Sequence, residues 1–98
     1  MNVLRRAREL GVKVAIADLG RWDEGALFAE YDARRKTIRV SGRHLLALSG
    51  AAARRRFFMR AVAHELYHHL EHVGAVDRLP TRAERERAAD RFARDAAP

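Results

Sequence analysis

A long segment without glycine or proline dominates this chain. Residues 51–73 are rich in Ala and Arg, which favour helix, and Gly74 follows at a position where helices commonly end. No other uninterrupted segment of the chain is as long. The sequence therefore predicts one extended helix, against which the shorter elements must pack to form a core.

Further helical segments are predicted on both sides of this helix. Apolar residues recur at helical spacing before Gly11, which indicates a short opening helix. Residues 45–48 are interpreted as a separate helical turn. After Pro80, Thr81 and Glu84 have the spacing of a capping box, in which each side chain satisfies a free backbone amide of the other residue. We expect this last helix to run towards Ala96.

Strand patterns lie between the first two helical segments. Residues 12–17 are apolar at the even positions and predict a half-buried strand. After a loop over residues 20–25, the runs 27–31 and 36–40 contain aromatic and β-branched residues. These two runs are joined by only four residues, so they predict a β-hairpin.

The order of these elements predicts an α+β fold. The chain has 98 residues, of which 48% are hydrophobic, and this suits a single compact domain over residues 1–98. We expect a small sheet packed on the N-terminal helix, the long helix and the C-terminal helix. No apolar run approaches the roughly 20 residues of a membrane helix, and no secretory signal is recognised. Without cysteine, the chain suits a reducing compartment, so we expect a cytoplasmic protein with no membrane association.

The long helix contains the motif His-Glu-x-x-His at His64, Glu65 and His68. At about 100° per residue, the two histidines lie one turn apart on one face, so both imidazoles can reach a single metal ion beside Glu65. Because the chain has no cysteine, any metal must be held by His, Asp or Glu. The motif predicts a metal site in which Glu65 does not ligate the ion.

A zinc site of this kind needs a third protein ligand. Four carboxylates compete for that position: Glu71, Glu84, Glu86 and Asp90. Glu71 is close along the same helix and would crowd the ion, so we interpret it as a surface residue or as a partner of a ligand. Glu84 is occupied at the helix cap, which leaves Glu86 as the third ligand. Asp90, one turn later, is expected to accept a hydrogen bond from a ligating imidazole.

The rest of the long helix has an apolar side. The apolar residues roughly opposite His64 are Met59, Val62, Leu66 and Val73. Phe57 and Ala61 lie on the side of the motif, where they could shape a pocket, although ordinary helix packing is the commoner role. Tyr67, His69 and His72 are near enough to be considered for stabilising an oxyanion, but packing or solvent exposure is the commoner role, and none is assigned as catalytic.

The order His64-Glu65-x-x-His68 followed by Glu86-x-x-x-Asp90 resembles the arrangement of the gluzincin metallopeptidases. A closer resemblance is to the ImmA/IrrE family, and the one-domain minigluzincins are an equally economical comparison. The residues that carry the closer resemblance are the basic and aromatic run 54–60, Ala63-His64-Glu65-Leu66, His72 and Glu86-Arg87-Ala88-Ala89-Asp90-Arg91-Phe92-Ala93. The resemblance covers residues 25–93 and implies a zincin-like fold.

The resemblance implies an intracellular zinc metalloendopeptidase. In that class His64, His68 and Glu86 would hold Zn²⁺, and Glu65 would act as the general base towards a metal-activated water. It also implies a protein or peptide substrate, with a helix-turn-helix repressor as one candidate, and a regulatory role. Manganese is an alternative metal, because two histidines and a carboxylate suit both ions.

Other functional classes remain open from the sequence. One is a catalytically silent metal-binding or DNA-associated module, and another is a latent protease whose cleft is blocked by the chain's tail or by a partner. The net charge of +7 permits acidic partners. The basic residues are scattered rather than gathered in one block, so nucleic acid is not expected as the main ligand. The sequence predicts no oligomeric state.

Overall fold

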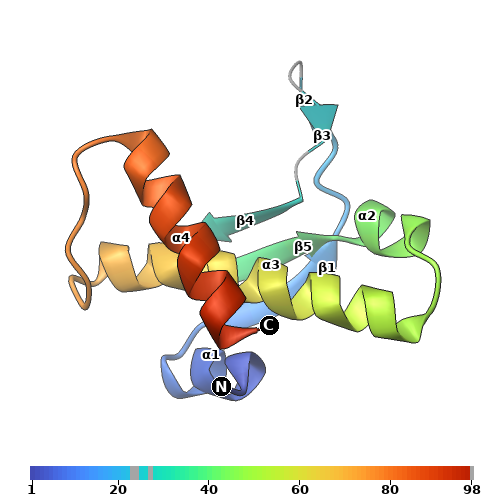
Figure 1. Ribbon diagram of the computed structural model, residues 1–98, viewed down its shortest axis with the longest axis horizontal. Helices are drawn as coiled ribbons and strands as arrows, with labels where there is room; N and C mark the ends of the chain where they lie inside the picture. Colours follow the sequence, from blue (N-terminus) through green and yellow to red (C-terminus); the bar gives the residue numbers. More distant parts are fainter. Residues whose placement is uncertain (23–24, 27, 98) are drawn as a thin grey trace.

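The computed structural model describes residues 1–22, 25–26 and 28–97. A long helix, α3 (Ala51–His72), runs through the middle of the molecule, with the sheet on one side of it and α4 (Arg82–Ala96) across another side (Figure 1). The predicted long helix is confirmed, including its end. Gly74 adopts a φ of 78°, and the amides of Gly74 and Ala75 donate to the carbonyls of Glu71 and Leu70. This pattern closes the helix with a left-handed glycine.

The main sheet has three strands in the order β1-β5-β4. The central strand β5 (Thr37–Ser41) pairs parallel with β1 (Lys13–Ala17) and antiparallel with β4 (Ala29–Asp32). The predicted hairpin is confirmed, with strand limits one or two residues from those expected. Leu27, the first residue of the predicted run, lies outside the described residues. Strand β4 is left at the edge of the sheet.

Two details of the strand region were predicted wrongly. Part of the expected loop over residues 20–25 forms a short antiparallel pair, β2 (Arg21–Trp22) with β3 (Gly25–Ala26). Strands of two residues are too short to show an alternating pattern. The side chain of Ile16, expected to be buried, is 60% exposed. It lies beside Gly42, which has no side chain to cover it.

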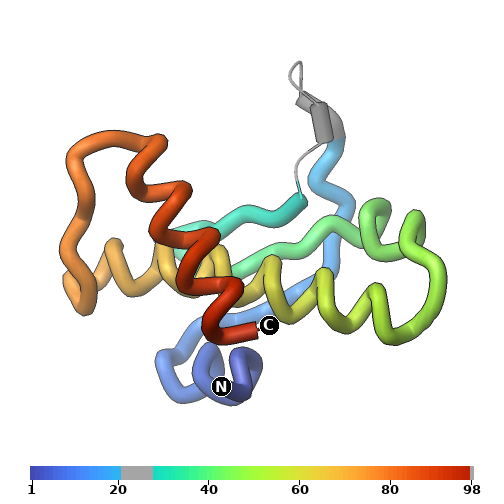
Figure 2. Tube along the Cα trace, in the orientation of Figure 1, coloured from blue at the N-terminus to red at the C-terminus, as the bar shows by residue number. Residues whose placement is uncertain are grey.

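The core lies between α3, the sheet and the two terminal helices. The buried residues that form it are Val3, Ala7, Val12, Ile38, Val40, Val62, Ala63, Leu66, Ala93 and Ala96. The first helix, α1 (Val3–Glu9), packs against both α3 and β1, and the short α2 (Gly42–Ala47) packs against α3. The α+β class is therefore confirmed. In the tube of Figure 2 the two ends of the chain lie close together, and both line one shallow surface pocket.

The apolar side of α3 agrees with its periodicity except at its end. Val62 and Leu66 are fully buried, and Met59 is partly buried. Val73 was expected on the same side but is 51% exposed. It follows the last helical residue and forms the cap, where helical spacing no longer sets its direction.

The last helix is capped and packed by short side chains. The hydroxyl of Thr81 accepts from the amide of Glu84, which is half of the predicted capping box. The buried face of α4 consists of alanines at positions 89, 93 and 96. Small side chains let the backbones of two packed helices approach closely, so residues at the edge of this face come near α3. No helix in the described part of the chain is long and apolar enough to cross a membrane.

Candidate metal centre

The two histidines of the motif converge as their helical spacing requires. The Nε2 atoms of His64 and His68 lie 3.3 Å apart. Their side chains are 20% and 22% exposed, so both rings are mostly buried but can be reached from solvent. The His64–Glu65–His68 group can hold a metal ion, because one ligand atom from each residue lies within 4.8 Å of the others.

Glu86 of α4 faces both imidazoles. Its Oε2 lies 2.9 Å from Nε2 of His64, and its Oε1 lies 3.3 Å from Nε2 of His68. Glu65 is further away, with 3.8 Å between its Oε2 and Nε2 of His64. The two Nε2 atoms and the Glu86 carboxylate therefore surround one point, and the Glu65 carboxylate lies beside it.

The outward nitrogen of each imidazole also contacts a carboxylate. Oδ1 of Asp90 lies 2.9 Å from Nδ1 of His64. Nδ1 of His68 is 2.7 Å from Oε1 of Glu71, whose side chain is only 6% exposed. A carboxylate can only accept a hydrogen bond, so each pair favours a proton on Nδ1 and a free lone pair on Nε2. Asp90 contacts an imidazole of the motif, as expected from the sequence. Glu71, interpreted from the sequence as either a surface residue or a partner of a ligand, contacts His68 and so has the second of these roles.

This donor set fits a tetrahedral metal ion. Without a cation, two Nε2 lone pairs and a carboxylate would face one another at short range, which is unfavourable. Ligands at about 2.0 Å from a tetrahedral ion lie about 3.3 Å from one another, close to the three separations found here. Three protein ligands leave one position open, which is typical of catalytic rather than structural sites. Glu84 is not among the residues that line the cleft, and its backbone amide donates to the Thr81 hydroxyl at the helix cap.

The Glu65 carboxyl is in an unusual environment. Its side chain is 12% exposed. Burial raises the pKa of Glu65 from 4.5 to about 7; the neighbouring His64 acts to lower it, and Glu86 acts to raise it further. A carboxyl with a pKa near neutrality can both take and release a proton at physiological pH, as a general acid and base must.

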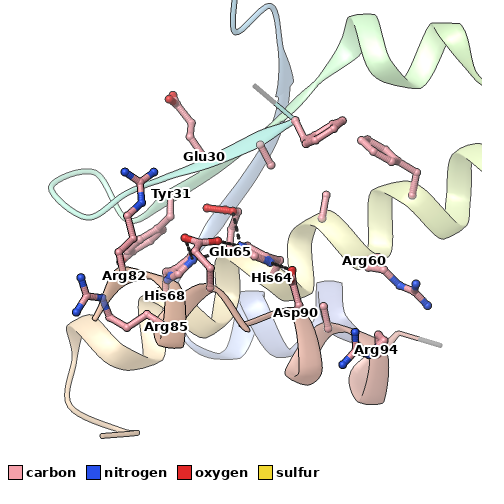
Figure 3. A pocket seen from close by; sticks show the side chains of 16 residues that line it. Glu30, Tyr31, Arg60, His64, Glu65, His68, Arg82, Arg85, Asp90 and Arg94 are labelled. Carbon is pink, nitrogen blue, oxygen red and sulfur yellow. Dashed lines mark hydrogen bonds and ion pairs between the residues drawn. The ribbon is translucent and has the colours of Figure 1, made fainter. Parts of the chain in front are cut away.

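The centre opens into a cleft of about 880 Å³ (Figure 3). On one side the cleft is bordered by β4 through three consecutive residues, Ala29, Glu30 and Tyr31. Alternate side chains of a strand point to opposite faces, so consecutive lining residues mean that the strand borders the cleft with its edge. The backbone groups of an edge strand are available to pair with a further strand.

Apolar residues also line the cleft, and of these Phe28 was not considered for it from the sequence. Phe57 and Ala61 line the cleft and also pack against the core, so both of the roles considered for them from the sequence are present. Phe28 also lines it, with its ring centroid 6.1 Å from that of Phe57. For Phe57 and Ala61 a signal existed, since both precede His64 on the same helix side.

Four arginines line the same cleft: Arg60, Arg82, Arg85 and Arg94. No local pattern in the sequence distinguishes them from the other arginines. Their position depends on how α4 crosses α3.

The remaining histidines and Tyr67 do not join the donor set. His69 is 2% exposed, and its Nδ1 lies 2.6 Å from the hydroxyl of Tyr31. Burial and the nearby Lys36 lower the pKa of His69. Tyr67 packs against the ring of Phe92, and His72 is exposed. His69 and Tyr67 therefore contribute to packing between elements.

The comparisons with known proteins add no family to this description. The chain matches no known protein family, no curated protein and no solved structure.

Proposed function

We propose that this chain is a zinc-dependent metalloendopeptidase with a zincin-like fold. The observation that carries the proposal is the convergence of the two Nε2 atoms and Glu86 on one point, with the buried Glu65 beside it. His64, His68 and Glu86 would hold the ion. Asp90 and Glu71 would fix the orientation of the two imidazoles.

A bound zinc ion supplies Lewis acidity, which polarises a carbonyl and makes water acidic enough to attack near neutral pH. Glu65 accepts the proton that this water loses as its oxygen bonds to the peptide carbon. The same carboxyl then delivers the proton to the amide nitrogen as the carbon–nitrogen bond breaks. Burial of the Glu65 carboxyl disfavours its charged form, so it favours uptake of the proton from the water.

The cleft favours an extended polypeptide as substrate. Strand β4 presents its edge to the cleft over residues 29–31, so the backbone of a peptide can add to it through main-chain hydrogen bonds. Such pairing recognises backbone rather than a particular side chain. It would hold the scissile bond across the floor of the cleft, near Glu65.

The proposal is tested with three proteins prepared in parallel. Wild type should contain about one zinc per chain and cleave members of a mixed peptide library, with metal measured by mass spectrometry and products by liquid chromatography. Glu65→Gln should keep the metal and lose cleavage, because the ligands remain while the base is removed. Glu86→Gln should lose most of the metal. Glu84→Gln is the matched control and should change neither property.

Two results would reject the proposal. One is cleavage that persists in Glu65→Gln, which would remove the assigned base. The other is metal content that follows Glu84 rather than Glu86, which would remove the assigned ligand set. A zinc-loaded wild type that cleaves no peptide but shows salt-sensitive DNA binding would support the non-catalytic DNA-associated alternative instead.

A further inference from the structure

The four arginines of the cleft lie in two pairs, one at each end of it (Figure 3). Arg82 and Arg85, from the start of α4, lie at one end. Arg60 of α3 and Arg94, near the end of α4, lie at the other. The metal centre lies between the two pairs.

Within the described part of the chain, these guanidinium groups are not neutralised by nearby acids. Among residues 1–22, 25–26 and 28–97, no carboxylate forms an ion pair with any of the four arginines. The hydrogen bonds that Arg60 and Arg85 donate to described residues go to backbone carbonyls, those of Ala97 and of Leu79 and Pro80 respectively. No hydrogen bond to a described residue is formed by Arg82 or Arg94.

The acidic residues of the cleft are engaged elsewhere. Glu86 and Asp90 contact the imidazole of His64, and Glu65 lies 3.8 Å from it. Glu30 pairs with Arg39 across the β4–β5 ladder. The cleft therefore has an acidic floor that is matched to a cation and two ends that carry unmatched positive charge.

We propose that the cleft selects peptides with acidic side chains on both sides of the scissile bond, an inference that rests on the proposed function. An extended peptide along the edge of β4 spans the cleft from one arginine pair to the other. Arginine binds carboxylates through paired hydrogen bonds, so each end of the cleft suits an Asp or Glu side chain. A lysine side chain at the same position would meet an unpaired like charge.

The direction of β4 predicts which arginine pair faces the acidic residues before the scissile bond and which pair faces those after it. In Figure 1, β4 runs towards the end of the molecule where α3 finishes. A peptide that pairs antiparallel with β4 then runs the opposite way, from Arg82 and Arg85 towards Arg60 and Arg94. Acidic residues before the scissile bond would face the first pair, and those after it would face the second.

Binding is the first test, and it does not depend on turnover. Zinc-loaded Glu65→Gln protein is titrated into fluorescein-labelled ten-residue peptides that carry either Asp or Lys on both sides of a central apolar pair, and anisotropy is measured at low and moderate salt. We expect the Asp peptide to bind at least tenfold more tightly than the Lys peptide. Arg82→Ala with Arg94→Ala should weaken the Asp peptide about threefold to tenfold. Arg87→Ala with Arg91→Ala, on the same helix but outside the cleft and with the same charge change, should weaken it less than twofold.

Cleavage then tests the direction. With peptides that carry Asp only before or only after the scissile bond, Arg82→Ala should lower kcat/KM mainly for the first set and Arg94→Ala mainly for the second. Equal binding of Asp and Lys peptides, or equal losses in the cleft and control pairs, would overturn the inference. Tighter, competitive binding of a single-stranded oligonucleotide of equal charge would overturn it in favour of a nucleic-acid ligand. Selective binding of the Asp peptide without any cleavage by wild type would instead reject the proposed function and leave the acidic preference standing.

Discussion

Replacing Glu65 by Gln should stabilise the metal-free protein, and the gain should grow with pH. The pKa of Glu65 is about 7 in the folded chain and 4.5 as its ordinary value, and burial is the main cause of the difference. Because the folded-state pKa is the higher one, the folded state favours the protonated carboxyl. Below pH 4.5 the carboxyl is protonated in both states, and Glu65 does not reduce the free energy of unfolding. As the pH rises from 4.5 towards 7, the free energy of unfolding falls, because only the unfolded state releases the proton easily.

The magnitude follows from these two values. At 1.36 kcal/mol for each pH unit, the full loss is about 3 kcal/mol well above pH 7 and about 1 kcal/mol at pH 5. Gln has a similar shape and no charge, so it avoids this loss. The difference in unfolding free energy between Glu65→Gln and wild type should thus increase by about 2 kcal/mol between pH 5 and pH 8.

The assay is urea denaturation of both proteins after removal of metal with a chelator, at several pH values across this range. Glu9→Gln is the control, since the Glu9 side chain is 53% exposed and its ion pairs lie on the surface. Its difference from wild type should stay within about 0.5 kcal/mol at every pH. A Glu65→Gln difference that is the same at pH 5 and pH 8 would refute the reasoning, because it would mean that burial does not disfavour the charged carboxylate.

Three further predictions concern the surroundings of the centre. Glu71→Ala should weaken zinc binding about tenfold to a hundredfold, measured by competition with a chromophoric chelator, because His68 loses the partner of its Nδ1. Tyr31→Phe should lower the free energy of unfolding by about 1 to 3 kcal/mol, measured by urea denaturation, because Nδ1 of the buried His69 loses its hydrogen bond. Unchanged stability would show that this hydrogen bond contributes nothing. Ala89→Leu should cost about 1 to 3 kcal/mol in stability and also reduce metal content, because a larger side chain on the buried face pushes α4 away from α3, and a loss of stability with full metal content would contradict that geometry.

The structural features that could be predicted are those marked by regular spacing, or by a glycine or proline, within a short stretch of sequence. The long helix, its end at Gly74 and the β4–β5 hairpin follow from local spacing, and so does the convergence of His64 and His68. The position of Glu86 beside the two histidines could not be predicted from local spacing, because Glu86 is far from the motif along the chain. It was predicted by excluding the carboxylates that are nearer in sequence.

What could not be predicted depends on the packing of separate elements. Ile16 is exposed although its alternating pattern predicts burial, and it lies beside Gly42, which comes from a distant part of the sequence. The arginines of the cleft are indistinguishable in sequence from those outside it, and only the crossing of α4 over α3 separates them. Phe28 enters the cleft because the edge of β4 lies beside the motif, which no periodicity of either segment encodes.

The alanine face of α4 determines which residues of this helix can be substituted without loss of the fold. His64, Glu65 and His68 belong to α3, whereas Glu86, Asp90 and three of the four cleft arginines belong to α4. Because α4 is attached to α3 through small side chains at positions 89, 93 and 96, its outward residues can vary without disturbing the buried seam. Under the proposed function, α3 would carry most of the chemistry and α4 most of the selectivity. Exchange of α4 alone, with Glu86, Asp90 and the alanines retained, should therefore give a protein with the same reaction and a different choice of peptide.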